Sequence, residues 1–209
     1  MTKILQIDSS PLGDASASRR LTASIVESLR RAAPDAVVQH RDLAAAPPAH
    51  LSGQVLQAMT SSQPEALTEA QRHERNLTDA LVEEFLAADI VVIGAPMYNF
   101  SVPTQLKAWI DRIAQAGKTF KYTENGPVGL AGSKRVVIAS SRGGAYAGNA
   151  TLQALDHQEA YLRTVLGFVG ITDITVVRAE GLAMGDASRV QALAQAQTQI
   201  DALSLRAAA

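Results

Sequence analysis

Residues 89–95 have the sequence DIVVIGA, which is apolar at both sets of alternating positions. A strand with one buried face alternates apolar and polar residues, whereas a strand covered on both faces is apolar throughout. The stretch therefore predicts the central strand of a parallel sheet that carries helices on both faces.

The chain on either side of this strand alternates between short apolar runs and helical patterns. Leu21, Ile25 and Leu29 recur at the spacing of one helix face, and Thr68 with Gln71 forms a capping box. Further strands are predicted at residues 3–8, 37–41, 135–140 and 173–178, and helices from 18 onward and over 68–88, 103–117, 151–167 and 187–205. Five strand–helix alternations predict an α/β fold, a doubly wound five-stranded parallel sheet with right-handed crossovers.

Two segments do not fit this alternation. Residues 44–66 hold three of the eight prolines with little periodicity, which predicts an irregular insertion with a short helix. Residues 118–130 alternate and contain Asn125-Gly126, which favours a surface excursion or a small hairpin.

Length and composition set the remaining bounds. With 209 residues, the chain predicts one domain over residues 1–209. Its net charge of −1 and the lack of a long Lys/Arg run do not support nucleic-acid binding, and no apolar stretch approaches the ~20 residues of a membrane helix. The absence of cysteine excludes disulfides, thiolate catalysis and Fe–S clusters. The N-terminal residues lack the apolar core of a signal peptide, so a cytoplasmic protein is expected.

Ligands of open parallel sheets bind outside the carboxyl ends of the strands, so three loops are candidates for a site. The first, residues 9–18, precedes a helix N-terminus and carries Ser10, Ser16 and Ser18. Unpaired N–H groups and hydroxyl donors there predict a phosphate cup, although Ser18 as a simple helix cap would also explain the serines. Neither G-x-G-x-x-G nor the P-loop motif is present, which disfavours a resident NAD or a nucleoside triphosphate.

The other two loops offer a wall for a flat ligand. Tyr98 and Phe100 supply apolar surface, while Met97 and Asn99 offer backbone and amide groups; packing of the aromatics into the core is the alternative. The third loop, Ser141-Arg142-Gly143-Gly144, exposes backbone N–H groups and adds the charge of Arg142, although a turn alone would explain the glycines.

Other chemistry finds little support. His40, His50, His73 and His157 lack metal-ligand spacing, and no G-x-S-x-G elbow is present. We expect no metal and no catalytic side chain.

These loops together resemble the bacterial FMN-dependent NADH azoreductase and quinone reductase family. The resemblance rests on the serine loop, on APMYNF at 95–100, on YTENGP at 122–127 and on SRGG at 141–144, and it covers essentially the whole chain. It implies a flavodoxin-like fold, a homodimer with noncovalent FMN at the subunit interface, and electron transfer from NADH or NADPH to quinones or azo compounds. In such an enzyme the cofactor performs the hydride chemistry, which explains why no acid–base pair is evident.

The resemblance also implies roles for individual positions. Ser10, Ser16, Ala17 and Ser18 would hold the phosphate and ribityl end, and Phe120 and Tyr122 would shape the substrate side. The isoalloxazine ring would lie against Met97, Tyr98, Asn99, Phe100, Ser141, Arg142, Gly143 and Gly144. An electron carrier without its own small-molecule acceptor is the alternative, but docking of such a carrier favours a strongly one-signed surface and this chain is almost neutral. A flavin-free protein on the same fold is a third possibility.

Overall fold

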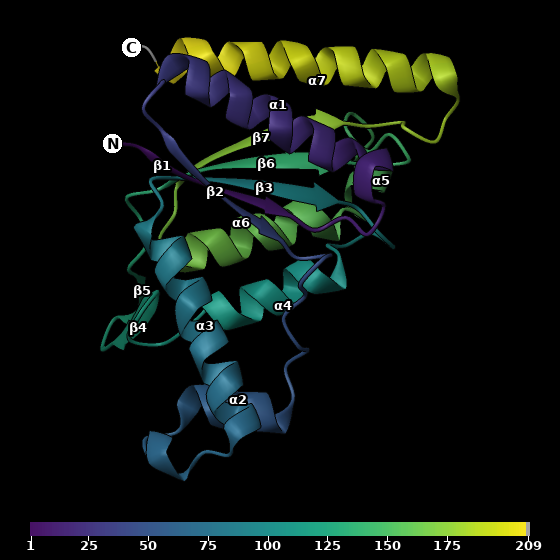
Figure 1. The fold of residues 1–209 in the computed structure, drawn as a ribbon. Helices are drawn as coiled ribbons and strands as arrows, with labels where there is room; N and C mark the ends of the chain where they lie inside the picture. Colours follow the sequence, from purple (N-terminus) through teal and green to yellow (C-terminus); the bar gives the residue numbers. More distant parts are fainter. Residues whose placement is uncertain (208–209) are drawn as a thin grey trace.

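A five-stranded parallel sheet forms the centre of the computed structural model, which describes residues 1–207 (Figure 1). The sheet has the order β2-β1-β3-β6-β7, with all neighbours parallel. Its strands are β1 (Lys3–Asp8), β2 (Val37–Asp42), β3 (Ile90–Pro96), β6 (Arg135–Ser141) and β7 (Asp173–Ala179). The predicted α/β fold and its five parallel strands are confirmed.

Helices cover both faces of the sheet. Helices α1 (Ala17–Ala32) and α7 (Asp186–Ala207) lie on one face, and α3 (Glu69–Ala87), α4 (Thr104–Ile113) and α6 (His157–Phe168) lie on the other (Figure 1). Strand β3 packs into both layers, because Val92 belongs to the core under α1 and α7 whereas Val91 and Ile93 belong to the core on the opposite face. This double burial is why the sequence of β3 is apolar at both alternating positions.

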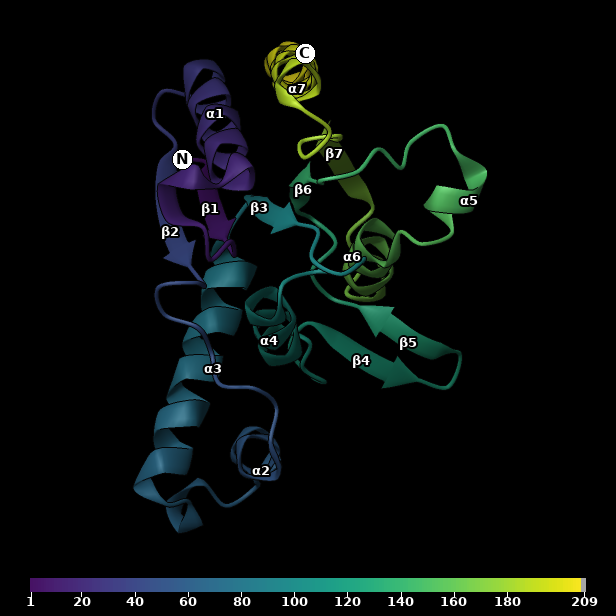
Figure 2. The same ribbon diagram turned by 90° about the vertical axis from the view of Figure 1, so that its right-hand side faces the viewer.

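The strand order creates a crevice between β1 and β3. The chain passes from β1 to β2 at one edge and then returns to place β3 on the other side of β1. The loops that leave β1 and β3 therefore diverge at their carboxyl ends, which face the viewer in Figure 2. This divergence is the topological switch point at which doubly wound folds bind ligands.

The 44–66 insertion forms a projecting arm. It contains α2 (Gly53–Thr60) and the short η2 (Pro64–Ala66), and α2 packs beside the N-terminal part of α3 (Figure 1). The Arg112 guanidinium anchors the arm, because its Nη2 donates to the Ala49 carbonyl at 3.1 Å and to the Glu74 carboxylate at 2.6 Å. The predicted short helix in this insertion is confirmed.

The predicted hairpin is also present, at the amino edge of the sheet. Strands β4 (Phe120–Thr123) and β5 (Gly126–Gly129) pair in antiparallel fashion after α4 has returned from the carboxyl edge. The backbone of Gly129 lies directly against that of Gly170 in the turn after α6, and a Cβ at Gly129 would lie only 2.1 Å from the Gly170 nitrogen.

Three predicted helix boundaries differ from the structure. The helix expected over 103–117 already ends at Ile113, because the chain turns there and the Gln115 N–H donates to Thr119 Oγ1 at 2.9 Å. The helix expected over 151–167 is broken into α5 (Ala150–Gln153) and α6, because the Asp156 carboxylate accepts hydrogen bonds from the N–H groups of Gln158 and Glu159 and caps a new helix. The first helix begins after Ser16 rather than at Ser18, since Ser16 Oγ accepts from the Arg19 N–H. Within residues 1–207, no helix is both long and apolar enough to cross a membrane.

Candidate functional site

A cavity of about 190 Å³ lies at the switch point, where the three candidate loops meet. Ser10 and Ser16 follow β1, Met97 and Tyr98 follow β3, and Gly143 follows β6. The full lining is Ser10, Leu12, Ala15, Ser16, Ala17, Pro96, Met97, Tyr98, Ser141, Arg142, Gly143, Leu182, Ala183 and Arg189. Residues of all three candidate loops therefore line one cavity, and their role in binding stays a prediction.

The serine loop forms the end of the cavity at the α1 N-terminus. Ser16 lines the cavity and caps α1, while Ser18 is fully buried and its Oγ lies 3.0 Å from Ser16 Oγ. Ser10 Oγ lies 3.3 Å from the Tyr98 hydroxyl, which links the first loop to the second. The free N–H groups and macrodipole of α1, with the Ser10 and Ser16 hydroxyls, form a site suited to an anion.

The loop after β3 is a tight turn with strained backbone. Tyr98 and Ser101 exchange both backbone hydrogen bonds at 3.0 and 3.1 Å, and Asn99 and Phe100 have φ values of 48° and 70°. These angles are those of a type I′ turn, whose two central residues both lie in the left-handed region. A bulky residue at positive φ is unusual, and such strain is concentrated at functional sites. Asn99 and Phe100 are exposed and do not line the cavity of this chain.

The loop after β6 is fixed by backbone hydrogen bonds to its neighbours. Met97 N–H donates to the Ser141 carbonyl at 2.8 Å, and Arg142 N–H donates to the Ala179 carbonyl at 2.9 Å. Gly143 lines the cavity, and a Cβ at this position would lie 3.3 Å from the Ala183 Cβ. Gly144 does not line the cavity; its carbonyl accepts from the Gly181 N–H.

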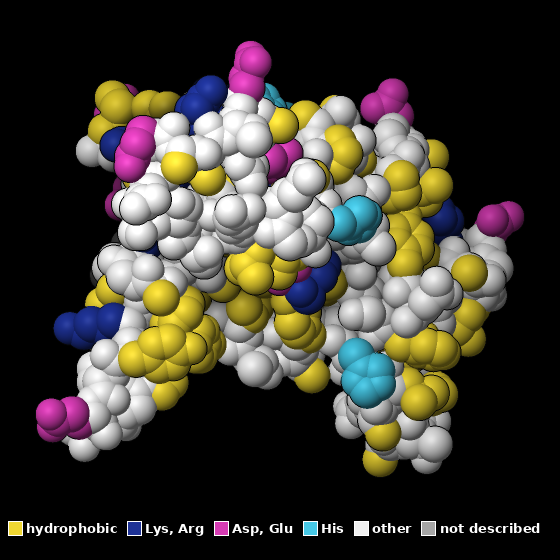
Figure 3. Space-filling model, turned by 90° about the horizontal axis from the view of Figure 1, so that it is seen from below, with side chains coloured by type: hydrophobic (Ala, Val, Ile, Leu, Met, Phe, Trp, Pro, Cys, Tyr) yellow, Lys and Arg dark blue, Asp and Glu magenta, His cyan; other side chains and the backbone are white. Residues whose placement is uncertain are grey.

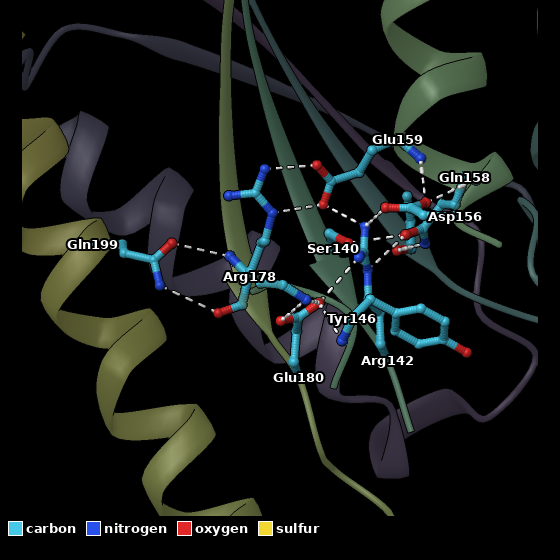
Figure 4. Close-up of polar contacts among 11 residues, drawn as sticks. Ser140, Arg142, Tyr146, Asp156, Gln158, Glu159, Arg178, Glu180 and Gln199 are labelled. Carbon is cyan, nitrogen blue, oxygen red and sulfur yellow. Dashed lines mark hydrogen bonds and ion pairs between the residues drawn. The ribbon is translucent and has the colours of Figure 1, made fainter. Parts of the chain in front are cut away.

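The Arg142 guanidinium is engaged in a buried polar network (Figure 4). Its side chain is only 2% exposed and forms ion pairs with Asp156 at 2.8 Å, with Glu180 at 3.0 Å and with Glu159. Arg178 approaches the same Glu159 carboxylate from the other side, and this contact raises the pKa of Arg178 above its ordinary value. Two cations thus face three carboxylates, so the positive charge expected at this loop from Arg142 is neutralised within the protein.

The network also holds the loops around the cavity. Arg142 Nε donates to Ser140 Oγ and to Gln158 Oε1, and Gln158 Nε2 donates to the Ala95 carbonyl at 2.7 Å in β3. The Glu180 carboxylate accepts from the backbone N–H groups of Tyr146 and Ala147. The network therefore joins β3, α6, the loop after β6 and the residue after β7 into one rigid support.

Sequence reasoning missed the fourth loop at this edge. Leu182, Ala183 and Arg189 line the cavity from the loop after β7 and the first turn of α7. The order β3-β6-β7 brings the carboxyl end of β7 beside that of β6. Because the sequence already predicts a parallel strand at 173–178, the loop after it could have been added to the candidate loops.

Phe120 and Tyr122 lie far from this cavity within the same chain. They belong to the hairpin at the amino edge, and the strands that separate the two edges are up to seven residues long, which corresponds to roughly 20 Å. Phe120 is buried, with its ring centroid 4.6 Å from that of Phe168, whereas Tyr122 is 74% exposed.

A larger hollow of about 790 Å³ lies on the projecting arm, between residues 49–55 and 68–74. It is remote from the carboxyl edge of the sheet and contains none of the residues that the sequence predicts for a site. The smaller cavity at the switch point combines an anion site with an apolar wall, and this combination makes it the candidate functional site.

Comparison with known proteins places the chain among flavoproteins. A family described by its flavodoxin-like fold matches residues 2–203. The FMN-dependent NADH:quinone oxidoreductase of Azospirillum brasilense is 68% identical over 207 residues, which cover 99% of this chain and 100% of that protein. The FMN-dependent NADH:quinone oxidoreductase 2 of Pseudomonas aeruginosa is 60% identical over 198 residues, covering 95% of this chain and 96% of that protein.

Solved structures agree with this placement. An FMN-dependent NADH-azoreductase of Bacillus anthracis in complex with FMN superimposes with a TM-score of 0.91 at 28% identity, and the match covers 100% of both chains. An azoreductase from the same species superimposes with a TM-score of 0.89 at 27% identity and covers 98% of this chain and 99% of that one.

Proposed function

Because the chain belongs to the flavodoxin-like family that includes the FMN-dependent NADH:quinone oxidoreductases, we propose that it is itself such an enzyme. It transfers two electrons from NADH or NADPH to quinones and azo compounds. The observation that carries the proposal is the meeting of three loops at the β1–β3 switch point, which joins an anion site to a flat apolar wall.

The donor set of the cavity fits FMN. The α1 N-terminus with Ser10 and Ser16 suits a single phosphate group, and Met97, Tyr98 and Gly143 offer the shelf and close backbone approach that a planar ring needs. When bound, FMN supplies the hydride chemistry, and the chain's own residues position it and exclude water. One phosphate site without a dinucleotide glycine motif favours FMN over FAD.

We propose that the active form is a homodimer with a site shared between subunits. The cavity of one chain is about 190 Å³, whereas ligand pockets that enclose a cofactor-sized molecule measure ~300–1,000 Å³. A second subunit would complete the enclosure, and Phe120 and Tyr122 could reach the cavity only from such a partner. Hydrophobic side chains gather on the face opposite α1 and α7, on two projections that flank a hollow (Figure 3). Tyr122, Val128 and Leu130 of the hairpin segment are among the exposed ones.

We propose further that NADH and the acceptor use one binding slot in turn. The cavity of one chain measures only about 190 Å³, which leaves no space for two substrates beside the cofactor, and no second nucleotide motif is present. Shape then limits the acceptor more than hydrogen bonding does, so broad acceptor tolerance is expected. Initial rates with NADH and quinone both varied should give parallel lines, whereas intersecting lines would indicate a ternary complex and contradict the single slot.

The function is tested by titrating the purified apoprotein with FMN and by anaerobic mixing. We expect quenching of flavin fluorescence at about one FMN per chain, loss of flavin absorbance near 450 nm on adding NADH, and recovery of absorbance on adding quinone. Absence of FMN binding would overturn the proposal. Flavin that NADH cannot reduce would favour the electron carrier instead. A cytoplasmic location remains a prediction from the N-terminal sequence.

A further inference from the structure

Arg189 is a partly buried cation that lines the cavity. It lies on the first turn of α7, and its side chain forms no hydrogen bond or ion pair with residues 1–203, the part of the chain whose side chains the structure describes. Its backbone N–H, in contrast, is satisfied by the Gly185 carbonyl. Holding an unpaired charge partly out of water is unfavourable, so a cation in this position is best explained by an anion that joins it.

The other charges near the cavity do not explain Arg189. No carboxylate is found among the described residues that line the cavity, and the Arg142 guanidinium is already neutralised by Asp156, Glu159 and Glu180. Arg19, which follows the serine loop, donates to the Asp42 carboxylate at 2.6 Å. The positive potential inside the cavity therefore comes from the α1 N-terminus and from Arg189.

The proposed cofactor brings the matching charge. Its phosphate monoester is close to a dianion at neutral pH, and the serine loop supplies hydroxyls and N–H groups but no full positive charge. Helices α1 and α7 pack side by side and both begin at the carboxyl edge of the sheet (Figures 1 and 2). Ser16 and Arg189 both line this cavity of about 190 Å³, so an anion held at Ser16 would share one small space with the guanidinium.

We propose that Arg189 is a phosphate-recognition residue that pairs with the 5′-phosphate of FMN. This inference rests on the proposed function and adds to it: Arg189 makes the site select the phosphorylated flavin over riboflavin. A guanidinium suits this task because its planar donors match phosphate oxygens in a bidentate arrangement.

The test compares FMN with riboflavin, which carries the same ring without the phosphate. Dissociation constants are measured by fluorescence quenching for the wild type, Arg189→Gln and Arg189→Lys, with Arg20→Gln as the matched control. Arg20 is exposed on α1 and does not line the cavity. We expect Arg189→Gln to weaken FMN binding about tenfold, the effect of roughly one charge-assisted contact, and to leave riboflavin binding unchanged. Arg189→Lys should recover part of the loss, and Arg20→Gln should resemble the wild type.

Two further readouts separate the possible sources of the phosphate. The affinity of the wild type for FMN should fall with rising salt more steeply than that of Arg189→Gln. The ratio of KM for NADPH to KM for NADH should be the same in both proteins, since a change confined to NADPH would assign Arg189 to the 2′-phosphate of that co-substrate and overturn the proposal.

The outcomes distinguish this inference from the function on which it rests. If the wild type binds neither flavin, the proposed function fails. If the wild type binds FMN but Arg189→Gln binds it equally well, or loses FMN and riboflavin in equal measure, only the role of Arg189 fails.

Discussion

Phe100 is held in a backbone conformation that suits glycine, and this conformation has a measurable cost. At φ 70° its Cβ crowds the backbone, by about 1–2 kcal/mol for an L-residue in the left-handed region. The type I′ turn needs such angles at both central positions, for which Asn-Gly is the favoured pair, and Asn99 already occupies the first. The ring of Phe100 is 47% exposed at the carboxyl edge, where the proposed site lies.

We therefore expect Phe100→Gly to stabilise the apoprotein by up to about 1 kcal/mol and to reduce turnover with quinone. Denaturant unfolding and initial rates measure the two effects. Phe100→Ala is the control, because it removes the ring but keeps the Cβ. Equal stability of the Gly and Ala variants would mean that the turn is not strained.

Tyr161 provides a titration signal that reports packing on the α6 face. Burial, and to a smaller extent the Asp111 carboxylate, raise the pKa of Tyr161 to about 12 from its ordinary 10. The unfolded chain ionises this phenol from about pH 10 upward, whereas the folded chain keeps it neutral until about pH 12. The free energy of unfolding therefore falls as the pH rises from 10 to 12. Absorbance at 295 nm should show a component with a midpoint near 12 that disappears in Tyr161→Phe. The component should persist in the Tyr122→Phe control. If it disappears there instead, it belongs to Tyr122 and the prediction for Tyr161 is wrong.

Among the elements, α6 depends on its first turn for both its own position and that of the loop after β6. Glu159 is the shared carboxylate between Arg142 and Arg178, and its side chain is 8% exposed. Glu159→Gln keeps the shape but removes the carboxylate that joins the two guanidiniums, so Arg142 and Arg178 each lose an ion pair. Removing one partner of a buried ion pair costs ~3–5 kcal/mol, and the lower end applies because the Arg178 side chain is 39% exposed.

We thus expect Glu159→Gln to lower the free energy of unfolding by about 3 kcal/mol, as measured by denaturant titration of the apoprotein. The same substitution at exposed Glu83 on α3 is the control and should change stability by less than ~0.5 kcal/mol. Similar values for the two variants would show that the network contributes little.

The fully buried Arg112 side chain ties the start of the projecting arm to α3 and α4. Arg112 donates to the Ala49 carbonyl, the Glu74 carbonyl and carboxylate and the Thr78 hydroxyl. Arg112→Met keeps most of the volume but removes these bonds, so local opening of the arm should become easier while the sheet persists. Limited thermolysin digestion should cut residues 44–66 faster than in the wild type. Lys107→Met, on an exposed position of the same helix, should not accelerate cleavage.

At the scale of the whole molecule, the proposed homodimer with its shared site can be tested by complementation between two defective variants. Gly143→Val blocks the cavity, since even a Cβ there meets the Ala183 Cβ at 3.3 Å, and Tyr122→Ala removes an exposed ring from the opposite edge. In a mixed dimer both defects fall on one site and the other site is intact. Refolding the two variants together should restore about a quarter of wild-type turnover, because about half of the dimers are mixed and each has one good site. Activity no higher than that of either variant alone would show that each site is built from one chain.

Much of this molecule was determined by local sequence. Unbroken apolar runs such as 89–95 require burial on both faces, and their alternation with helical patterns permits few arrangements other than a doubly wound sheet. The same alternation placed the loops after β1, β3 and β6 at one edge. The capping box at Thr68 and the hairpin at Asn125-Gly126 could also be predicted from the sequence, because each depends on residues only a few positions apart.

Tertiary structure alone decided which side chains at that edge remain available to a ligand. Sequence predicted a positive charge from Arg142, but Asp156, Glu159 and Glu180, from 14 to 38 positions along the chain, surround its guanidinium. The sequence did not predict a role for Arg189, which the pairing of β6 with β7 brings to the cavity. Charges act through space and are cancelled or left uncompensated by whichever partners folding brings within a few ångströms, so their net effect is fixed only when the distant segments have met.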